Sequence, residues 1–141
     1  MRRVMQGPLN PTRSAVQADQ EAGTSSAVFV TPAVQQSHPS AAKAIVVFNG
    51  TSGAITPLFA FNVTTVTANA AGDYTVQFIT PFSTSGYAAI ATAESTGGNI
   101  PDQLSVASGT MLASSVRMLT RNPGGTLTNF DHTAFVFYGD Q

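Results

Sequence analysis

Over residues 43–141, apolar and polar residues alternate in short runs, which is the period of a β-strand. Two such runs lie within residues 61–78, where Phe61 and Val63 are expected on the aromatic-rich face of a hairpin. Turn residues separate the runs at spacings of about 8–12 residues; the turns are Asn49-Gly50, Ala71-Gly72-Asp73 and Asn122-Pro123-Gly124-Gly125. The pattern predicts an all-β fold, an antiparallel β-sandwich of jelly-roll-like type.

The first 42 residues lack this alternation and contain four of the eight prolines. Two short helical turns are expected among them. Ser14 and Gln17 fit a capping box, with Gly23 at the point where the helix would stop. Thr31-Pro32 is a second start signal, and a short strand could lie between the two turns, over residues 26–30. We therefore predict an irregular N-terminal segment, residues 1–42, followed by a β-sandwich domain, residues 43–141.

Charged residues make up only 9% of the chain, against roughly 25% in ordinary domains. A surface of this kind suits a protein that is partly covered by copies of itself. The net charge of −1 gives no electrostatic footprint for nucleic acid, and no apolar run approaches the ~18 residues of a membrane span. Because cysteine is absent, a disulfide framework and a thiolate zinc site are excluded. We expect no cofactor and no metal.

Catalytic patterns are weak throughout the chain. Asp131 and His132 could be half of a catalytic triad, but a G-x-S-x-G motif is absent, and a polar loop before the last strand is the simpler interpretation. Two carboxylates could flank a glycosidic bond, although Asp73 lies at a tight turn and Asp140 near the C-terminus. The remaining acidic residues of the domain are Glu94 and Asp102. We expect a protein that is not an enzyme.

Two polar loops, over residues 94–104 and 120–132, are the places where a rigid β scaffold could carry a binding function. The loop before the last strand holds the candidate receptor-contacting residues: Arg121, Asn122, Phe130 and His132. An aromatic ring can stack on a sugar while amide and guanidinium groups bind its hydroxyls. The alternative is that Phe130 packs inward and that the Asn-Pro-Gly-Gly stretch only turns the chain.

Residues 16–44 resemble a segment that is widespread in bacteriophage tail fibre proteins. The matching positions are Ala18, Gln20-Glu21-Ala22-Gly23, Thr31-Pro32 and Gln35-Gln36. The stretches HPSAAKA, FNG, FNVTTVT and GDYTVQF that follow are similar to a small β domain at the C-termini of phage fibre and virion structural proteins. The chain lacks the long shaft of a full-length fibre, so the resemblance implies a short fibre or a spike-like component.

The resemblance also implies how such a protein would work. The N-terminal segment would attach to other virion proteins, through residues that include Glu21, Gly23, Thr31, Pro32 and Gln35. The β domain would be displayed outward, in a homotrimer, and could touch a host surface glycan. Since no hydrophobic stretch follows Arg2-Arg3, we expect no secretory signal: the protein would be made in the host bacterial cytoplasm and end in the virion.

Two other classes of protein stay open at this point. One is a capsid decoration or cement protein, which binds the junctions of capsid subunits and recognises no host. The other is a free carbohydrate-binding module or a glycoside-cleaving enzyme.

Overall fold

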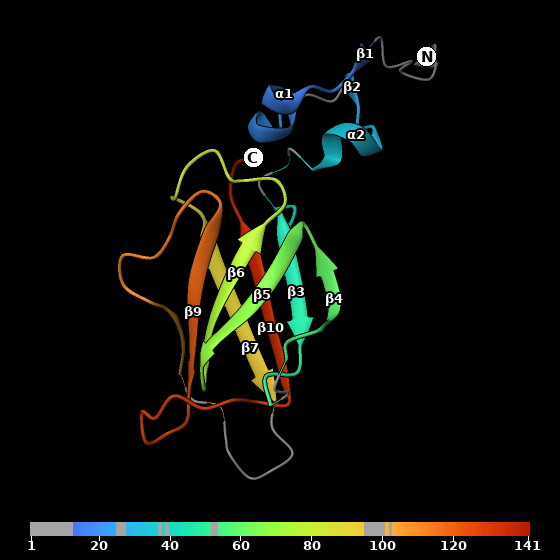
Figure 1. The fold of residues 1–141 in the computed structure, drawn as a ribbon. Helices are drawn as coiled ribbons and strands as arrows, with labels where there is room; N and C mark the ends of the chain where they lie inside the picture. Colours follow the sequence, from blue (N-terminus) through green and yellow to red (C-terminus); the bar gives the residue numbers. More distant parts are fainter. Residues whose placement is uncertain are drawn as a thin grey trace, which may run out of the picture. The chain divides into compact units, whose positions relative to one another are not determined.

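Figure 1 shows the fold in a computed structural model, which describes residues 13–24, 28–36, 38, 40–51, 54–94, 101 and 103–141. The chain divides into two compact units, Met1–Ala41 and Ala42–Gln141. The division falls one residue before the boundary expected from the sequence.

The N-terminal unit contains two very short strands and two short helices. Strand β1 (Arg13–Ser14) pairs in parallel with β2 (Val28–Phe29), and the helices are α1 (Gln17–Ala22) and α2 (Pro32–Gln35). The Thr31-Pro32 start signal is confirmed, because Thr31 is the N-cap of α2 and Pro32 its first residue. The short strand expected within residues 26–30 is β2.

The predicted capping box of α1 is wrong. The N-cap is Val16, whose backbone N–H donates to Asp19 Oδ2 at 2.9 Å, while Ser14 belongs to β1. The amide of Gln17 instead donates along the helix to Glu21 Oε1 at 2.7 Å. Gly23 does end the helix, with the left-handed φ of 62° that glycine adopts at low cost.

The second unit is an all-β sandwich of two four-stranded antiparallel sheets, as predicted. One sheet has the order β4-β3-β10-β7 and the other β5-β6-β9-β8; the jelly-roll-like type stays a prediction. The strands are β3 (Ala44–Phe48), β4 (Pro57–Phe61), β5 (Val63–Ala70), β6 (Asp73–Phe78), β7 (Ala88–Glu94), β8 (Gln103–Val106), β9 (Ser115–Arg121) and β10 (His132–Tyr138).

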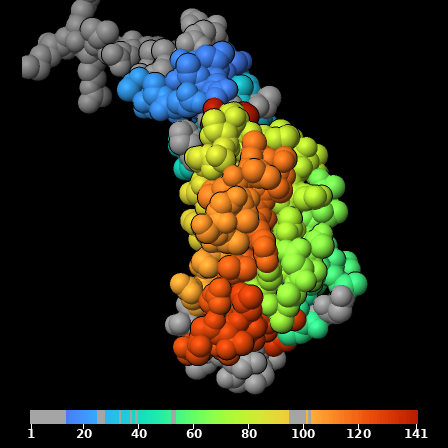
Figure 2. All heavy atoms as spheres, turned by 60° about the vertical axis from the view of Figure 1, so that its left-hand side comes forward, coloured from blue at the N-terminus to red at the C-terminus, as the bar shows by residue number. Residues whose placement is uncertain are grey.

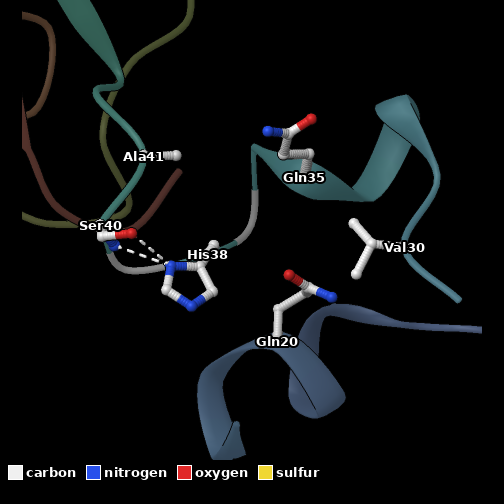
Figure 3. A pocket seen from close by; sticks show the side chains of 6 residues that line it. All are labelled: Gln20, Val30, Gln35, His38, Ser40 and Ala41. Carbon is white, nitrogen blue, oxygen red and sulfur yellow. Dashed lines mark hydrogen bonds between the residues drawn. The ribbon is translucent and has the colours of Figure 1, made fainter. Parts of the chain in front are cut away.

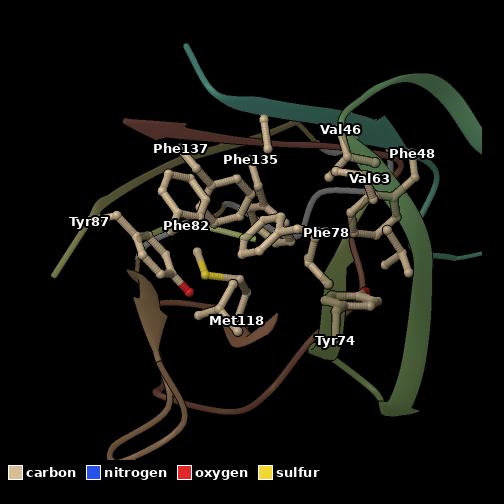
Figure 4. Packing of buried hydrophobic residues seen from close by; sticks show 14 residues of the cluster. Val46, Phe48, Val63, Tyr74, Phe78, Phe82, Tyr87, Met118, Phe135 and Phe137 are labelled. Carbon is tan, nitrogen blue, oxygen red and sulfur yellow. The ribbon is translucent and has the colours of Figure 1, made fainter. Parts of the chain in front are cut away.

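Aromatic rings fill the space between the two sheets (Figure 4). Phe48 of β3 meets Tyr74 of β6 edge-on with 4.9 Å between ring centroids, and Phe78 meets Phe137 in the same way at 5.1 Å. Such edge-to-face pairs contribute beyond the area that they bury. The alternation of residues 74–78 is therefore confirmed as a core-facing pattern, since Tyr74, Val76 and Phe78 are all buried.

The hairpin of residues 61–78 begins later than expected. Phe61 is the last residue of β4, in the other sheet, and is exposed, whereas Val63 starts β5 and is buried. Asn62 between them has a φ of 53°, the one non-glycine residue of the described chain in the left-handed region. Its side chain donates to Lys43 O at 2.9 Å and accepts from Thr80 N at 2.7 Å. These bonds hold the corner at which the chain changes sheets.

The strand directions give the sandwich two different ends. Ala44 at the start of β3 lies opposite Phe137 near the end of β10, so the chain enters and leaves the sandwich at one end. The other end carries the turn after β3, the β5–β6 turn and the segment between β9 and β10, at the bottom of Figure 1. We call it the loop end, defined by residues 49–51, 71–72 and 122–131.

Candidate functional site: the loop end of the sandwich

The segment before β10 is fixed to the body of the sandwich by side-chain hydrogen bonds. Asn129 Oδ1 accepts from the Gly72 N–H at 2.6 Å and from the Tyr74 hydroxyl at 2.8 Å. Thr120 Oγ1 donates to Thr128 O at 2.6 Å, and the Thr128 N–H donates back to Thr120 O at 3.0 Å. Residues 127–130, which we call the buttress, are thus hydrogen-bonded both to β6 with the turn before it and to β9.

Two glycines make this close approach possible. At Gly72, where φ is +64°, a Cβ would collide with the backbone of Thr128, Thr120 and Leu127. At Gly50, a Cβ would meet the Tyr74 hydroxyl, and the Gly50 N–H donates to Phe130 O at 2.9 Å. Both turns therefore require glycine for packing, and Gly72 also for its backbone conformation.

Phe130 does not face a receptor. Its side chain is 0% exposed, and its carbonyl holds the Gly50 turn, so no ring face is free for a sugar. The expectation that Phe130 contacts a receptor is wrong, and the alternative that it packs inward is confirmed. The physical reason is that the buttress turns this large apolar side chain into the protein, where its burial stabilises the fold.

Arg121 and Asn122 shape the exposed turn that follows β9. Arg121 Nη1 donates to Gly125 O at 2.8 Å, and Asn122 Oδ1 accepts from the Thr126 N–H at 3.0 Å. Both side chains are half-buried, while residues 123–126 are exposed. The turn is therefore a preformed, exposed structure, with the Arg121 guanidinium bound to its backbone.

His132 lies apart from that turn. It is exposed, begins β10 and stands opposite Glu94 of β7, on the sheet that does not contain Arg121. The preceding Asp131 is 3.4 Å from the Thr51 hydroxyl, which donates toward its Oδ1. The structure thus brings Arg121 and Asn122 together in one turn and places His132 on the other sheet. Most of the loop expected over 94–104 lies outside the described residues, and β8 begins within it at Gln103.

Asp73 has a role that the sequence did not reveal. The side chain is only 3% exposed and accepts from Arg117 Nε at 2.7 Å, from a second guanidinium nitrogen of Arg117 and from Asn69 Nδ2 at 3.0 Å. The hydrogen bonds from Arg117 lower the pKa of the Asp73 carboxyl, against the opposing effect of burial. Cross-strand position on β6 and β9 brings the pair together, and no local motif marks it.

The N-terminal unit has an open pocket of its own, about 530 Å³ in volume (Figure 3). His38 Nδ1 accepts from Ser40 Oγ at 2.6 Å and from the Ser40 N–H at 3.1 Å, so a neutral ring carries its proton on Nε2. The pocket is lined by Gln20, Val30, Gln35, His38, Ser40 and Ala41.

Most of the residues expected to attach the chain have local structural roles in this unit. Thr31 and Pro32 start α2, Gly23 ends α1, and Glu21 is exposed on α1. Among the five, only Gln35 lines the pocket.

The described residues offer neither a metal site nor a membrane-spanning helix. No group of three or more His, Cys, Asp or Glu among the described residues could hold a metal ion. None of the helices described is long and apolar enough to cross a membrane. Comparison of the chain with protein-family models, with curated proteins and with solved structures finds no match.

Proposed function

We propose that the chain is a phage virion structural protein, a short fibre or spike-like component that attaches by its N-terminal unit and displays the β-sandwich. The observation that carries the proposal is that the two ends of the sandwich differ. The chain enters it at one end, beside its own C-terminus and the β6–β7 and β8–β9 connections, and the loop end with the exposed turn after β9 lies opposite. A domain held at Ala42 can therefore present the loop end away from its support. The resemblance of residues 16–44 to phage tail fibre segments supports the same arrangement.

The exposed turn after β9 is the part of the loop end that suits contact with a host surface. Its backbone is held by Arg121 and Asn122, so little ordering entropy is lost when a ligand binds. The Thr126 hydroxyl and the backbone carbonyls of residues 123 and 124 can exchange hydrogen bonds with a glycan, while the Gly125 and Thr126 carbonyls accept from Arg121 and Asn122 within the turn. His132 would add to this contact only from the neighbouring sheet. Assembly as a homotrimer would present three such turns together and raise the effective affinity for a repeated glycan.

A capsid decoration protein is the second candidate, and one observation favours it. The outer face of the sheet β4-β3-β10-β7 is rich in apolar side chains, several of them exposed, among them Phe59, Phe61 and Ile90. A face of this kind could lie against a capsid lattice instead of against copies of the chain.

Locating the chain in purified particles tests the proposal. Antibodies against the full chain, coupled to gold, are applied to virions from a producing culture and viewed by electron microscopy. Gold at the tail or at projecting fibres is the expected result. Regular gold over the whole head would support the decoration protein, and particles that contain no chain by immunoblot would overturn both. Particles without the chain are tested for adsorption to host cells as a separate readout.

A further inference from the structure

The two outer faces of the sandwich differ sharply in chemistry. The outer face of the sheet β5-β6-β9-β8 carries hydroxyl, amide and charged side chains, among them Thr65, Gln77 and Arg117. In Figure 2 the green β5 and the orange β9 of this sheet are turned toward the viewer. These groups bond to one another across strands, as Thr65 Oγ1 does to Gln77 Oε1 at 3.1 Å. A polar face of this kind is typical of a sheet surface that contacts water.

The outer face of the sheet β4-β3-β10-β7 is apolar. One row across the four strands contains Phe61, Ile45, Val136 and Ile90 in register. The next row contains Phe59, Val47, Ala134 and Thr92. A third pairs Tyr138 with Ala88. We call these ten residues the apolar face.

Large side chains of the apolar face are exposed to solvent. Phe59 on the edge strand β4 is 54% exposed, Ile90 on the opposite edge strand β7 is 53% exposed, and Leu58, next to Phe59 in the chain, is 64% exposed. Leu58 has no partner in the β3–β4 register, because the register shifts at this point. Edge strands that meet water normally carry charged side chains or proline, whereas β4 reads Pro-Leu-Phe-Ala-Phe and has no charge or further proline after its first residue. A contiguous apolar patch of this kind marks an interaction site.

We propose that the apolar face is the surface through which copies of this chain associate. The inference rests on the proposed function for one point, that the chain assembles with itself, and it names the surface. Charge supports a second copy as the occupant. The strands β3, β4, β7 and β10 carry no Lys or Arg, and Glu94, at one corner beside His132, is their one acidic residue. Two copies can therefore meet without bringing like charges together in the centre.

The size of the face predicts how strong the contact is. Four strands at about 4.8 Å and about six residues at about 3.4 Å give a flat area of roughly 400 Å² per copy. A stable pair of proteins usually buries about 800 Å² per partner. One face-to-face contact is therefore smaller than the interface of a permanent dimer, and association should be reversible and depend on concentration.

The same dimensions also fit a ring of three. Three sheets that are each about 19 Å wide would enclose an axis about 5.5 Å from each sheet, close to half of the ~10 Å at which packed sheets lie. Side chains of the apolar face would then fill the centre. In such a ring the β4 edge of one copy meets the β7 edge of the next, which would cover Leu58 as well.

The test measures the mass of the purified full chain by light scattering or sedimentation from about 1 to 200 µM. The expected result is a mass that rises above the monomer with concentration. Ile90→Lys and Phe59→Glu, both at exposed positions, should each raise the dissociation constant at least about 30-fold, because a charge would be buried without a partner. Thr67→Lys is the matched control, at an exposed position on β5 of the other sheet, and should leave association unchanged. Circular dichroism and thermal melting establish that each variant is folded.

A chain that stays monomeric at every concentration would overturn the inference, and so would an oligomer that both face variants leave intact. Binding of the monomer to capsid protein instead would assign the face to that partner and would also overturn it. The outcome is separate from the proposed function. A chain that labels virions but never associates with itself loses this inference and the homotrimer, while its place in the virion stands. A chain that associates through the face but is absent from virions loses only the proposed function.

Discussion

At the scale of single residues, Phe130 is the largest side chain in the segment before β10, and its position is set by its neighbours. Asn129 bonds to Gly72 and Tyr74, and the Phe130 carbonyl accepts from Gly50. The Phe130 ring therefore stabilises the fold by its burial, and the Phe130 backbone stabilises it by a hydrogen bond.

Replacing Phe130 by alanine should therefore destabilise the fold. The substitution Phe130→Ala removes a fully buried ring, and we expect a loss of about 3–5 kcal/mol and a fall in melting temperature of more than about 10 °C. Thr126→Ala, at an exposed position in the same segment, is the control and should change stability by less than about 0.5 kcal/mol. Calorimetry checks both. A Phe130→Ala protein that melts with the wild type would show that the ring is not packed.

The Asp73–Arg117 pair predicts how stability depends on pH. The folded-state pKa of Asp73 is lowered, so its contribution is present above the usual carboxyl pKa of about 4 and is lost as the pH falls through the folded-state value. Asp73→Asn should therefore melt well below the wild type at pH 7, and the difference should shrink toward pH 3. Glu94→Gln, at an exposed position, serves as the control. A difference that is the same at pH 7 and pH 3 would contradict the ion pair.

The candidate site was only partly predictable from the sequence, and the reason lies at this scale. The turn at Asn122-Pro123-Gly124-Gly125 follows from local residue types, and the structure has a turn there. The burial of Phe130 depends on Asn129, Gly72 and Gly50, which are distant in the chain, so no local pattern could decide it. The Asp73–Arg117 pair likewise depends on the register between β6 and β9.

At the scale of elements, the central strands were predictable because each has one buried face. In β6 the buried residues Tyr74, Val76 and Phe78 alternate with polar ones, and the strand lies where the alternation indicated. Strand β10 is apolar at successive positions from Ala134 to Tyr138, and the turn residues before it marked its place. Strand β4 is also apolar on successive positions, but it begins with a proline, which strands seldom contain, so no pattern marked it. Strand β8 is four residues long and lies in a stretch that reads as a polar loop.

The two helix starts also show what a local sequence signal can and cannot predict. Thr31-Pro32 predicts the start of α2 correctly, because proline is confined to the first turn of a helix. The start of α1 was placed too early, since Ser14 is drawn into pairing with β2 and Asp19 supplies the cap from inside the helix. A residue that could cap a helix does not do so when it is paired in a strand, as Ser14 is.

At the scale of the whole molecule, the two units should differ in stability. All aromatic residues except Phe29 lie in the sandwich, and Phe29 is exposed. The helices of the N-terminal unit are six and four residues long, well short of the length at which a helix is stable by itself. The ordering of a residue costs ~1–2 kcal/mol, which so small an apolar content offsets poorly.

A chain that begins at Ala42 should therefore fold. We expect it to be all-β by circular dichroism, to melt within a few degrees of the full chain and to fail to join virions. The control is the full chain with Gln35→Ala, which keeps the N-terminal unit and changes one residue of its pocket. A truncated chain that is insoluble or melts far lower would show that the N-terminal unit belongs to the folded core.

The pairing of β3 with β10 also sets how the protein responds to mechanical force. A load between Ala42 and the loop end runs along these antiparallel strands and is shared by all five of their residue pairs, as in shear. A load between the two termini, which leave the sandwich at the same end, would separate the pairs one after another. Because the chain has no cysteine, Gly124→Cys gives a single attachment point for force spectroscopy. Unfolding should need a clearly larger force from Gly124 than from the C-terminus; equal forces would contradict the shear geometry. Such a domain resists a load applied at its loop end and unfolds most easily under a load applied between its termini.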